Sequence, residues 1–473
     1  MPTKVDRPGA FELSDVILIS YQSFDGSGTP KRLSIRSLVQ EISIYESLDG
    51  KFLSGDMTLL DATNAIQTLP ITGFERVEFF FRTPGTDKGF DFSVATGHPM
   101  FVYALQNRTG ANPRSQIYTL KFISQEAIRN HQTRVSQAFT GNIDQMVTDI
   151  CYNYLKTKKD LIVEDTKGAF KFTMPRLKPS MAIENLRKNA QSLHYENSGF
   201  LFFENGDGFN FKSYEGLFCK KDGSPRPTKA HYSPKIKNIG EDPVYALQSV
   251  ENFTILKQFD TLNNTANGVY ASRLITHDLY NKTFSENDFD YNKEYSKQNH
   301  LEQDDNGDKR SDNGILPFFN YDTGETFGNK NEGVLYYQST TSKVHDSYEQ
   351  PEVTDILQKR VSQHIAANSL MIEIIAPGTT ELRVGDIVNF TLPKYAPNSK
   401  NDTKDNDKYL SGRYLISAAR HHVSTLNKRH TLALELIKDS FNIGYPEEEN
   451  ELFTTNEAQD GGAYRASAID DLS

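Results

Sequence analysis

The sequence predicts an α+β fold that is mainly β, with two β regions separated by an α+β unit. Short apolar runs alternate with polar residues over 11–130, and such runs return in 246–283 and 370–440. Between them, apolar side chains recur at helical spacing over 143–155. A chain of 473 residues is long enough for about two to four domains, each with its own hydrophobic core.

The first β region, residues 1–130, holds several short predicted strands. Asp49-Gly50 stands between two alternating runs and predicts a hairpin, because Gly tolerates the positive φ of a tight turn. In the run 76–82 the odd-numbered apolar residues are expected to face a core and the charged residues to face away. Phe80 breaks this pattern on the outer face and is a candidate contact with another domain or subunit. A barrel or a sandwich would accommodate these strands.

The middle unit, residues 131–245, is predicted to be α+β. One helical face collects Ile143, Met146, Val147, Ile150, Cys151 and Leu155. Cys151 on this stripe is expected to be a small core residue and not a nucleophile. Pro179-Ser180 opens a second helix, with Ser180 as its expected N-cap. The turn residues 205–208 join two aromatic strands in a predicted hairpin.

Residues 246–283 and 370–440 are predicted to form one discontinuous β domain. A strand is expected over 270–279 within it. The intervening residues 284–369 form an acidic insert that ends in a helix over 353–365. Residues 441–473 have no apolar periodicity and form an acidic C-terminal tail.

The negative charge is concentrated in two segments. The net charge is −10 for the whole chain, −7 over residues 440–473 and −5 over 284–313, which leaves about +2 for the body. Acidic segments of this kind are usually mobile or lie on the surface of another chain. The body has no basic stripe that would favour sequence-specific nucleic-acid binding, and no run approaches the ~18 apolar residues of a membrane span.

The motifs give no support for an active site. The sequence has no phosphate-binding P-loop, no HExxH and no GxSxG. Its two cysteines, Cys151 and Cys219, cannot by themselves form a disulfide framework or a four-ligand zinc site. The cysteine content favours a reducing place of folding. The run 304–308 resembles a calcium loop, but Lys309 and Ile315 stand where an EF-hand needs Gly and Glu. An acidic solvated loop is therefore expected there.

His421, His422 and His430 are the best metal-ligand candidates. Adjacent residues on a strand face opposite sides, so His421 and His422 are not expected to serve one ion. We expect all three to be polar residues near strand ends. The sequence therefore predicts no catalytic, cofactor or metal site, and no enzymatic activity.

Six segments together carry a family resemblance. They are NAIQTLPITGFERVEFFF (64–81), YTLKFISQEAIRNHQTRVSQAFTG (118–141), SGFLFFENGDGFNF (198–211), GVYASRLITHDLYNKTF (268–284), ELRVGDIVNFTLP (381–393) and GRYLISAARHHVSTLNKRHTLALELI (412–437). With these six segments in this order, the chain resembles the baseplate central hub protein of T4-type contractile-tailed bacteriophages. It is also similar to the N-terminal hub part of type VI secretion spike proteins and to phage late-control hub proteins. No catalytic positions come with this resemblance.

The resemblance implies a homotrimer in which each chain supplies two tail-tube-like β-barrel domains, namely residues 1–130 and the discontinuous second domain. Six barrels would form a ring that adapts the six-fold tail tube to the three-fold central spike. The implied partners are the tail tube protein, a separate spike protein and baseplate wedge proteins, with DNA only as passing cargo and no stable membrane association. The implied location is the tail baseplate of the virion, after assembly in the host cytoplasm.

Two other functions stay open at this point. One is a tube-terminating or adaptor protein of a tail-like secretion system, and the other, less favoured, is a tail-associated hydrolase. Type VI-like members continue into an OB domain and a β-helical spike, whereas this sequence ends with the acidic tail. The spike is therefore expected to be a separate polypeptide, with Glu447, Glu448, Glu449 and Glu451 as candidate contacts to it. A solvated tail is the alternative.

Overall fold

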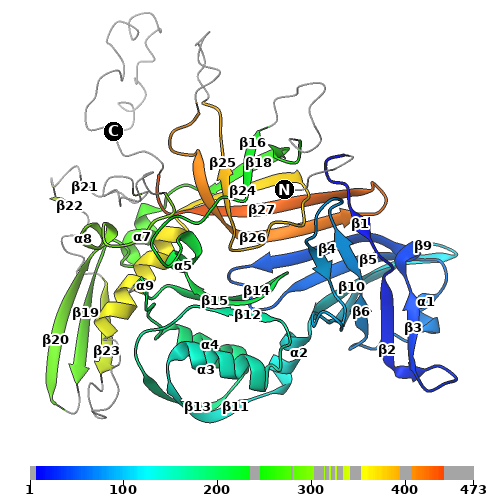
Figure 1. Ribbon diagram of the computed structural model, residues 1–473, viewed down its shortest axis with the longest axis horizontal. Helices are drawn as coiled ribbons and strands as arrows, with labels where there is room; N and C mark the ends of the chain where they lie inside the picture. Colours follow the sequence, from blue (N-terminus) through cyan, green and yellow to red (C-terminus); the bar gives the residue numbers. More distant parts are fainter. Residues whose placement is uncertain are drawn as a thin grey trace, which may run out of the picture.

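The computed structural model describes residues 7–195, 197–234, 246–278, 281–302, 314, 319–320, 325–326, 334–340, 353–394 and 406–441. Over these residues the chain is mainly β, and one sheet of 14 strands runs through both β regions (Figure 1). The predicted α+β, mainly β class is confirmed. The two-barrel layout stays a prediction, because none of the described sheets closes into a barrel.

The first β region supplies seven neighbouring strands of the large sheet, in the order β4-β5-β10-β9-β6-β2-β3. Its elements are β1 (Glu12–Leu13), β2 (Ile17–Phe24), β3 (Pro30–Ser34), a 3-10 turn (Arg36–Leu38), β4 (Val39–Ser47), β5 (Ser54–Asp61), α1 (Ala65–Thr68), β6 (Arg76–Glu78), β7 (Phe80–Arg82), β8 (Gly89–Asp91), β9 (Met100–Asn112) and β10 (Ser115–Ser124). The hairpin predicted around Asp49-Gly50 is confirmed by the antiparallel pairing of β4 with β5.

The run 76–82 has the predicted alternation, because Val77, Phe79 and Phe81 are all buried. However, the run is divided between two sheets. β6 pairs with β2 and β9 in the large sheet, whereas β7 pairs with β1 and β8 in a separate three-stranded sheet. The chain changes sheet at Phe79, which packs edge-to-face on Phe92 with ring centroids 4.8 Å apart.

The middle unit packs two helices and small sheets around a core rich in phenylalanine. Its elements are α2 (Gln125–Gln132), β11 (Val135–Gly141), α3 (Ile143–Asp149), a π-helical turn (Ile150–Tyr154), β12 (Asp160–Val163), β13 (Phe170–Leu177), α4 (Pro179–Arg187), β14 (Phe200–Asn205), β15 (Gly208–Ser213) and α5 (Tyr214–Phe218). All six residues of the predicted helical stripe are buried in this core. The hairpin predicted over 205–208 is confirmed by the pairing of β14 with β15.

The predicted N-cap of α4 was wrong. Lys178 occupies the N-cap position and Pro179 is the first helical residue, so Ser180 lies inside the first turn. The free backbone N–H of Ser180 donates instead to Asn130 Oδ1, at 2.8 Å. Because Asn130 is 50 residues away in the chain, the local sequence held no signal for it.

The second β region completes the large sheet. Its elements are β17 (Ser249–Val250), β18 (Asn252–Lys257), α7 (Thr261–Ala266), β24 (Leu370–Pro377), β25 (Ile387–Phe390), β26 (Gly412–Ser424) and β27 (Arg429–Lys438). Strand β16 (Ala230–Pro234), from residues predicted to belong to the middle unit, joins them by pairing with β17 and β25. One edge of β26 pairs with β27, and the other edge pairs with β25 through Gly412–Leu415 and then with β4 through Ala418–Ser424. Strand β26 therefore joins the two β regions into one sheet.

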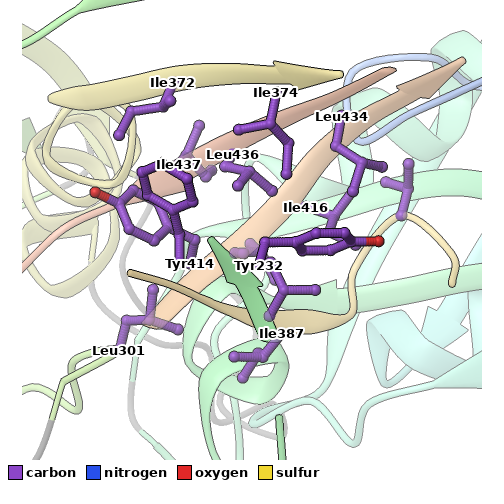
Figure 2. Packing of buried hydrophobic residues seen from close by; sticks show 14 of the residues in the cluster. Tyr232, Leu301, Ile372, Ile374, Ile387, Tyr414, Ile416, Leu434, Leu436 and Ile437 are labelled. Atoms are coloured by element: carbon purple, nitrogen blue, oxygen red, sulfur yellow. The ribbon is translucent and has the colours of Figure 1, made fainter. Parts of the chain in front are cut away.

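The core of the second β region lies between β24, β26 and β27 on one side and β16 and β25 on the other (Figure 2). Tyr232, Ile372, Ile387, Tyr414 and Leu436 meet there, and each is at most 2% exposed. Fully burying one such side chain stabilises a fold by about 1.5–3 kcal/mol. This core is separate from the cores of the first β region and of the middle unit.

Residues of the acidic insert form part of a projecting three-stranded sheet (Figure 1). Its elements are β19 (Ala271–Asp278), β20 (Thr283–Asp290) and β23 (Leu335–Thr340), followed along the chain by α9 (Val353–Ala367), while α8 (Tyr291–Tyr295) follows β20 and β21 (Phe319–Asn320) pairs with β22 (Glu325–Thr326). The strand predicted over 270–279 is present as β19, but it pairs with β20 and β23 and not with the large sheet. The predicted helix over 353–365 is confirmed as α9.

Candidate functional site: buried junctions and exposed surfaces

Phe80 lies on the outer face of β7, as predicted, and is half-buried. The Arg82 guanidinium lies 5.7 Å from the centroid of its ring, and across the β7–β8 pair Gly89 lies opposite Arg82. These contacts are within the chain, so the role of Phe80 in an interface stays a prediction. The other candidate contacts, Glu447, Glu448, Glu449 and Glu451, lie outside the described residues.

All three candidate histidines lie near strand ends, as expected, and two of them are buried in the interior. His421 on β26 and His430 on β27 are fully buried, with His421 Nδ1 3.2 Å from His430 Nε2. They are covered because Phe81 and Phe90 pack on their rings. His422 faces the opposite side, where its Nδ1 lies 3.2 Å from Ser43 Oγ. Within the described ranges, no group of three or more His, Cys, Asp or Glu residues could hold a metal ion.

Both cysteines are buried, and neither forms a disulfide. Cys151 lies in the core of the middle unit, as the helical stripe predicted. Burial raises the pKa of the Cys151 thiol, so the nucleophilic thiolate is disfavoured at neutral pH. Cys219 is fully buried in the core of the second β region. The arrangement of Cys151 gives a packing role and no basis for covalent chemistry.

A first buried junction is built around Arg383, which stands before β25 and is 2% exposed. Its Nε lies 3.1 Å from Asp207 Oδ1 in the β14–β15 turn. Its Nη2 donates to the Gly89 carbonyl at 3.0 Å, and the guanidinium lies 4.2 Å from the centroid of the Phe90 ring. One side chain therefore contacts the first β region, the middle unit and the second β region. The planar guanidinium suits this position because it carries five donors and also stacks on an aromatic ring.

Glu46 on β4 completes this junction. Its carboxylate accepts the backbone N–H of Gly206 at 2.6 Å and that of Val384 at 3.0 Å, and it lies 4.0 Å from Arg383 Nε. Burial raises the pKa of Glu46 to about 7, although Arg383 and the two N–H donors act in the opposite direction. The carboxyl group thus changes its protonation near neutral pH while it joins three segments of the chain.

A second buried junction is built around Lys159, between the first β region and the middle unit. Its Nζ lies 2.8 Å from Glu126 Oε2 and 2.5 Å from Glu204 Oε1. Glu204 also accepts the backbone N–H of Leu53 and the hydroxyl of Ser124, at 2.9 and 2.8 Å. Burial lowers the pKa of Lys159, but the two carboxylates outweigh burial and raise it above its ordinary value. Burial raises the pKa of Glu204.

A third buried junction, made of two pairs, ties residues 300–302 of the acidic insert to the end of β27 and the residue that follows it. Lys438 Nζ lies 3.0 Å from Glu302 Oε1, and His300 Nδ1 lies 2.9 Å from Asp439 Oδ2. Glu302, which the charge count places in an acidic stretch expected to be mobile or on another chain, is in fact a buried structural partner. Residues 303–313 of that stretch, including the suspected calcium loop, lie outside the described residues.

These junctions were not predictable from the sequence, because their members are distant in the chain. Glu46 and Val384 are 338 residues apart, and Glu204 and Ser124 are 80 apart. A local signal was nevertheless present at Glu204, since a charge directly after the run Phe200–Phe203 is unusual in a buried strand. Such a charge requires a partner when it is buried.

An open hollow of about 380 Å³ lies on the middle unit, beside α3. Asp144, Asp149 and Asp165 line it, but all three carboxylates are already engaged. Asp144 accepts a hydrogen bond from the hydroxyl of Thr166, Asp149 accepts one from the amide of Asn153, and Asp165 pairs with Lys221.

In the part of the chain that the structure describes, no helix is long and apolar enough to cross a membrane.

The fold is similar to that of a solved tail protein. No family model matches the sequence, and no curated protein matches it. The structure is similar to the tail protein from Neisseria meningitidis MC58, with a TM-score of 0.50 and 10% identity over 91% of this chain and 97% of that chain. At this identity, the likeness establishes a shared fold.

Two further solved structures are similar at lower TM-scores. The 43 kDa tail protein of prophage MuSo2 from Shewanella oneidensis gives a TM-score of 0.46 and 10% identity, over 90% of this chain and 98% of that chain. The second is the E. coli c3393 protein, a type VI secretion component described as similar to the T4 bacteriophage tail proteins gp27 and gp5. It gives a TM-score of 0.39 and 8% identity, over 87% of this chain and 76% of that chain.

Proposed function

We propose that this chain is a structural subunit of the baseplate hub of a contractile tail. In this proposal three copies form a ring that adapts the six-fold tail tube to the three-fold central spike. The observation that carries it is the fold shared with the Neisseria tail protein over 91% of this chain and 97% of that one. Because the likeness runs along nearly the whole of both chains, it concerns the complete arrangement of units and not one common module.

The organisation of the β regions supports the ring. Each of the two β regions has its own hydrophobic core, and β26 holds them in one sheet. Three chains would therefore present six β units to the tube, and each unit would be a tube-like barrel in the assembled ring. Closed ring symmetry would bury the sheet edges that a single chain leaves unpaired.

The buried junctions support a structural role. Arg383, and Glu204 with its partner Lys159, each fix the middle unit to a β region through several short contacts. A hub has to keep its units in fixed positions while the tail contracts around it, and buried ionic contacts with defined geometry serve that requirement. The remaining partners of the proposal are the wedge proteins outside the ring, and DNA as cargo in transit.

The mass of the protein in solution tests the proposal. We expect a homotrimer in light-scattering measurements, and a larger complex when the tail tube protein or the spike protein is added. A stable monomer that ignores both partners would contradict the hub function. A trimer that binds the tube and no spike would favour the tube-terminating alternative.

We further propose that the acidic tail contacts the spike through Glu447, Glu448, Glu449 and Glu451. Changing these four residues to Gln is expected to reduce recovery of the spike in co-purification. The matched control changes Glu457, Asp460, Asp470 and Asp471 to their amides, which removes the same charge elsewhere in the tail. Equal recovery with both variants would exclude a specific contact at 447–451.

A further inference from the structure

The paired histidines lie at the seam where the two β regions meet. His421 and His430 come from the second β region, while the aromatic rings that cover them, Phe81 and Phe90, come from the small β1-β7-β8 sheet of the first. The rings of the two histidines stack with centroids 5.4 Å apart. The N-terminal segment also reaches the seam, because the Gly9 carbonyl accepts the backbone N–H of His430 at 2.8 Å.

The described residues offer no hydrogen-bond partner for a proton added to either ring. The 3.2 Å contact between His421 Nδ1 and His430 Nε2 is a hydrogen bond that needs one proton between the two atoms. The outer nitrogens, His421 Nε2 and His430 Nδ1, are buried and have no hydrogen-bond partner among the described residues. Gly378 packs directly against the His430 ring, since a Cβ at this position would lie 2.1 Å from it.

The charges around the pair all oppose protonation. From the segment before β25, Arg383 acts on His421, and from β26, His422 acts on His430. The small sheet contributes phenylalanine rings, and β4 places the apolar Ile44 opposite His421. The carboxylates of this part of the chain form ion pairs with arginines. Glu46 and Asp207 pair with Arg383, and Glu251 pairs with Arg429.

We propose that the His421–His430 pair is an acid-sensitive latch on this seam. Protonation of one ring leaves the hydrogen bond in place but puts a second cation beside Arg383 in an apolar space, and protonation of both rings removes the hydrogen bond. The seam then opens, and the small β1-β7-β8 sheet with the N-terminal segment separates from β26 and β27. This inference does not depend on the tail function, since it follows from the packing of one chain.

The direction of the pH effect follows from linkage. Burial lowers the pKa of both histidines, that of His430 to about 3, whereas an exposed histidine titrates near 6.5. The open seam therefore binds more protons than the closed seam once the pH falls below about 6.5. Opening is favoured by about tenfold per pH unit for each histidine that becomes exposed.

Amide hydrogen exchange of the full chain, followed by mass spectrometry between pH 7.5 and 4.5, tests the latch. After correction for the intrinsic exchange rate, we expect protection of peptides covering 79–92 and 372–382 to fall by at least tenfold per pH unit below pH 6.5. A peptide covering 143–155, in the core of the middle unit, is the internal reference and should keep its protection.

The variants His421→Gln and His430→Gln separate the latch from general acid instability. Each single variant should show a weaker pH dependence at the seam than the natural chain, and the double variant should show none, whatever its absolute protection. An unchanged pH dependence in the variants would overturn the proposal. An equal fall in the reference peptide, or no fall at the seam of the natural chain, would overturn it as well.

Discussion

At the scale of single residues, the side chain of Lys159 holds a buried cluster of charges together. One ammonium group satisfies two buried carboxylates, and Glu204 in turn receives a backbone N–H and a hydroxyl from the first β region. Such a cluster adds little to the free energy of unfolding compared with an apolar core of the same shape. Removing one member lowers that free energy strongly, because each remaining charge stays buried without its partner.

Lys159→Met is therefore expected to destabilise the chain by about 3–5 kcal/mol. The substitution keeps most of the length of the side chain and removes the one ammonium group that contacts Glu126 and Glu204 among the described residues. The control is Lys158→Met at the exposed neighbouring position, which should change the free energy of unfolding by no more than about 0.5 kcal/mol. Urea denaturation of both variants provides the comparison, and equal midpoints would contradict the expectation.

At the scale of elements, the first β region depends on close approach between neighbouring strands. Gly55 on β5 faces the ring of Phe122 on β10, and a Cβ at this position would lie 2.4 Å from Phe122 Cζ and 2.5 Å from the Ser43 carbonyl oxygen. A glycine inside a strand usually weakens it, so its presence here reflects the space that the aromatic ring needs.

Gly55→Ala should destabilise the chain by about 1–3 kcal/mol, because Phe122 has to leave its position in the core. Gly110→Ala is the matched control: it also lies inside a strand, β9, and a Cβ there would meet nothing within 4 Å. Thermal unfolding of the two variants should give a lower midpoint for Gly55→Ala only. A lower midpoint for Gly110→Ala of the same size would show that loss of glycine, and not overpacking, is the cause.

Local elements could be predicted from the sequence wherever periodicity was strong. The helical stripe from Ile143 to Leu155 and the alternation over 76–82 both follow from burial of one face, which a local pattern records. The change of sheet at Phe79, the cap supplied by Asn130 and the pairing of β19 with β23 depend on distant residues. For the same reason the junctions at Lys159 and Arg383 were not predictable, and neither was the burial of the histidine pair.

At the scale of the whole molecule, the hydrophobic cores of the first β region, the middle unit and the second β region are connected by buried charges. Glu46 is central, since it contacts the β14–β15 turn and the segment before β25 from its position on β4. Its protonation therefore influences the stability of the complete assembly of units and not of a single strand.

Glu46→Gln is expected to change the pH dependence of stability. The folded chain holds a proton on Glu46 up to about pH 7, whereas the unfolded chain releases it near 4.5, so the natural chain loses stability as the pH rises through this window. The difference in unfolding free energy between variant and natural chain should shift by up to about 3 kcal/mol in favour of the variant between pH 4.5 and 7.5. A pH-independent difference in urea denaturation would contradict this.

Strand β26 determines how the molecule bears a mechanical load. Seven successive residue pairs, from Ala418–Ser47 to Ser424–Glu41, connect β26 to β4, and β27 pairs with the opposite edge of β26. A force that pulls the two β regions apart along the strand direction loads these backbone hydrogen bonds in shear, so they have to fail together and not one after another. The connection is therefore stiffest along the strands and weakest when one end of β26 is peeled away.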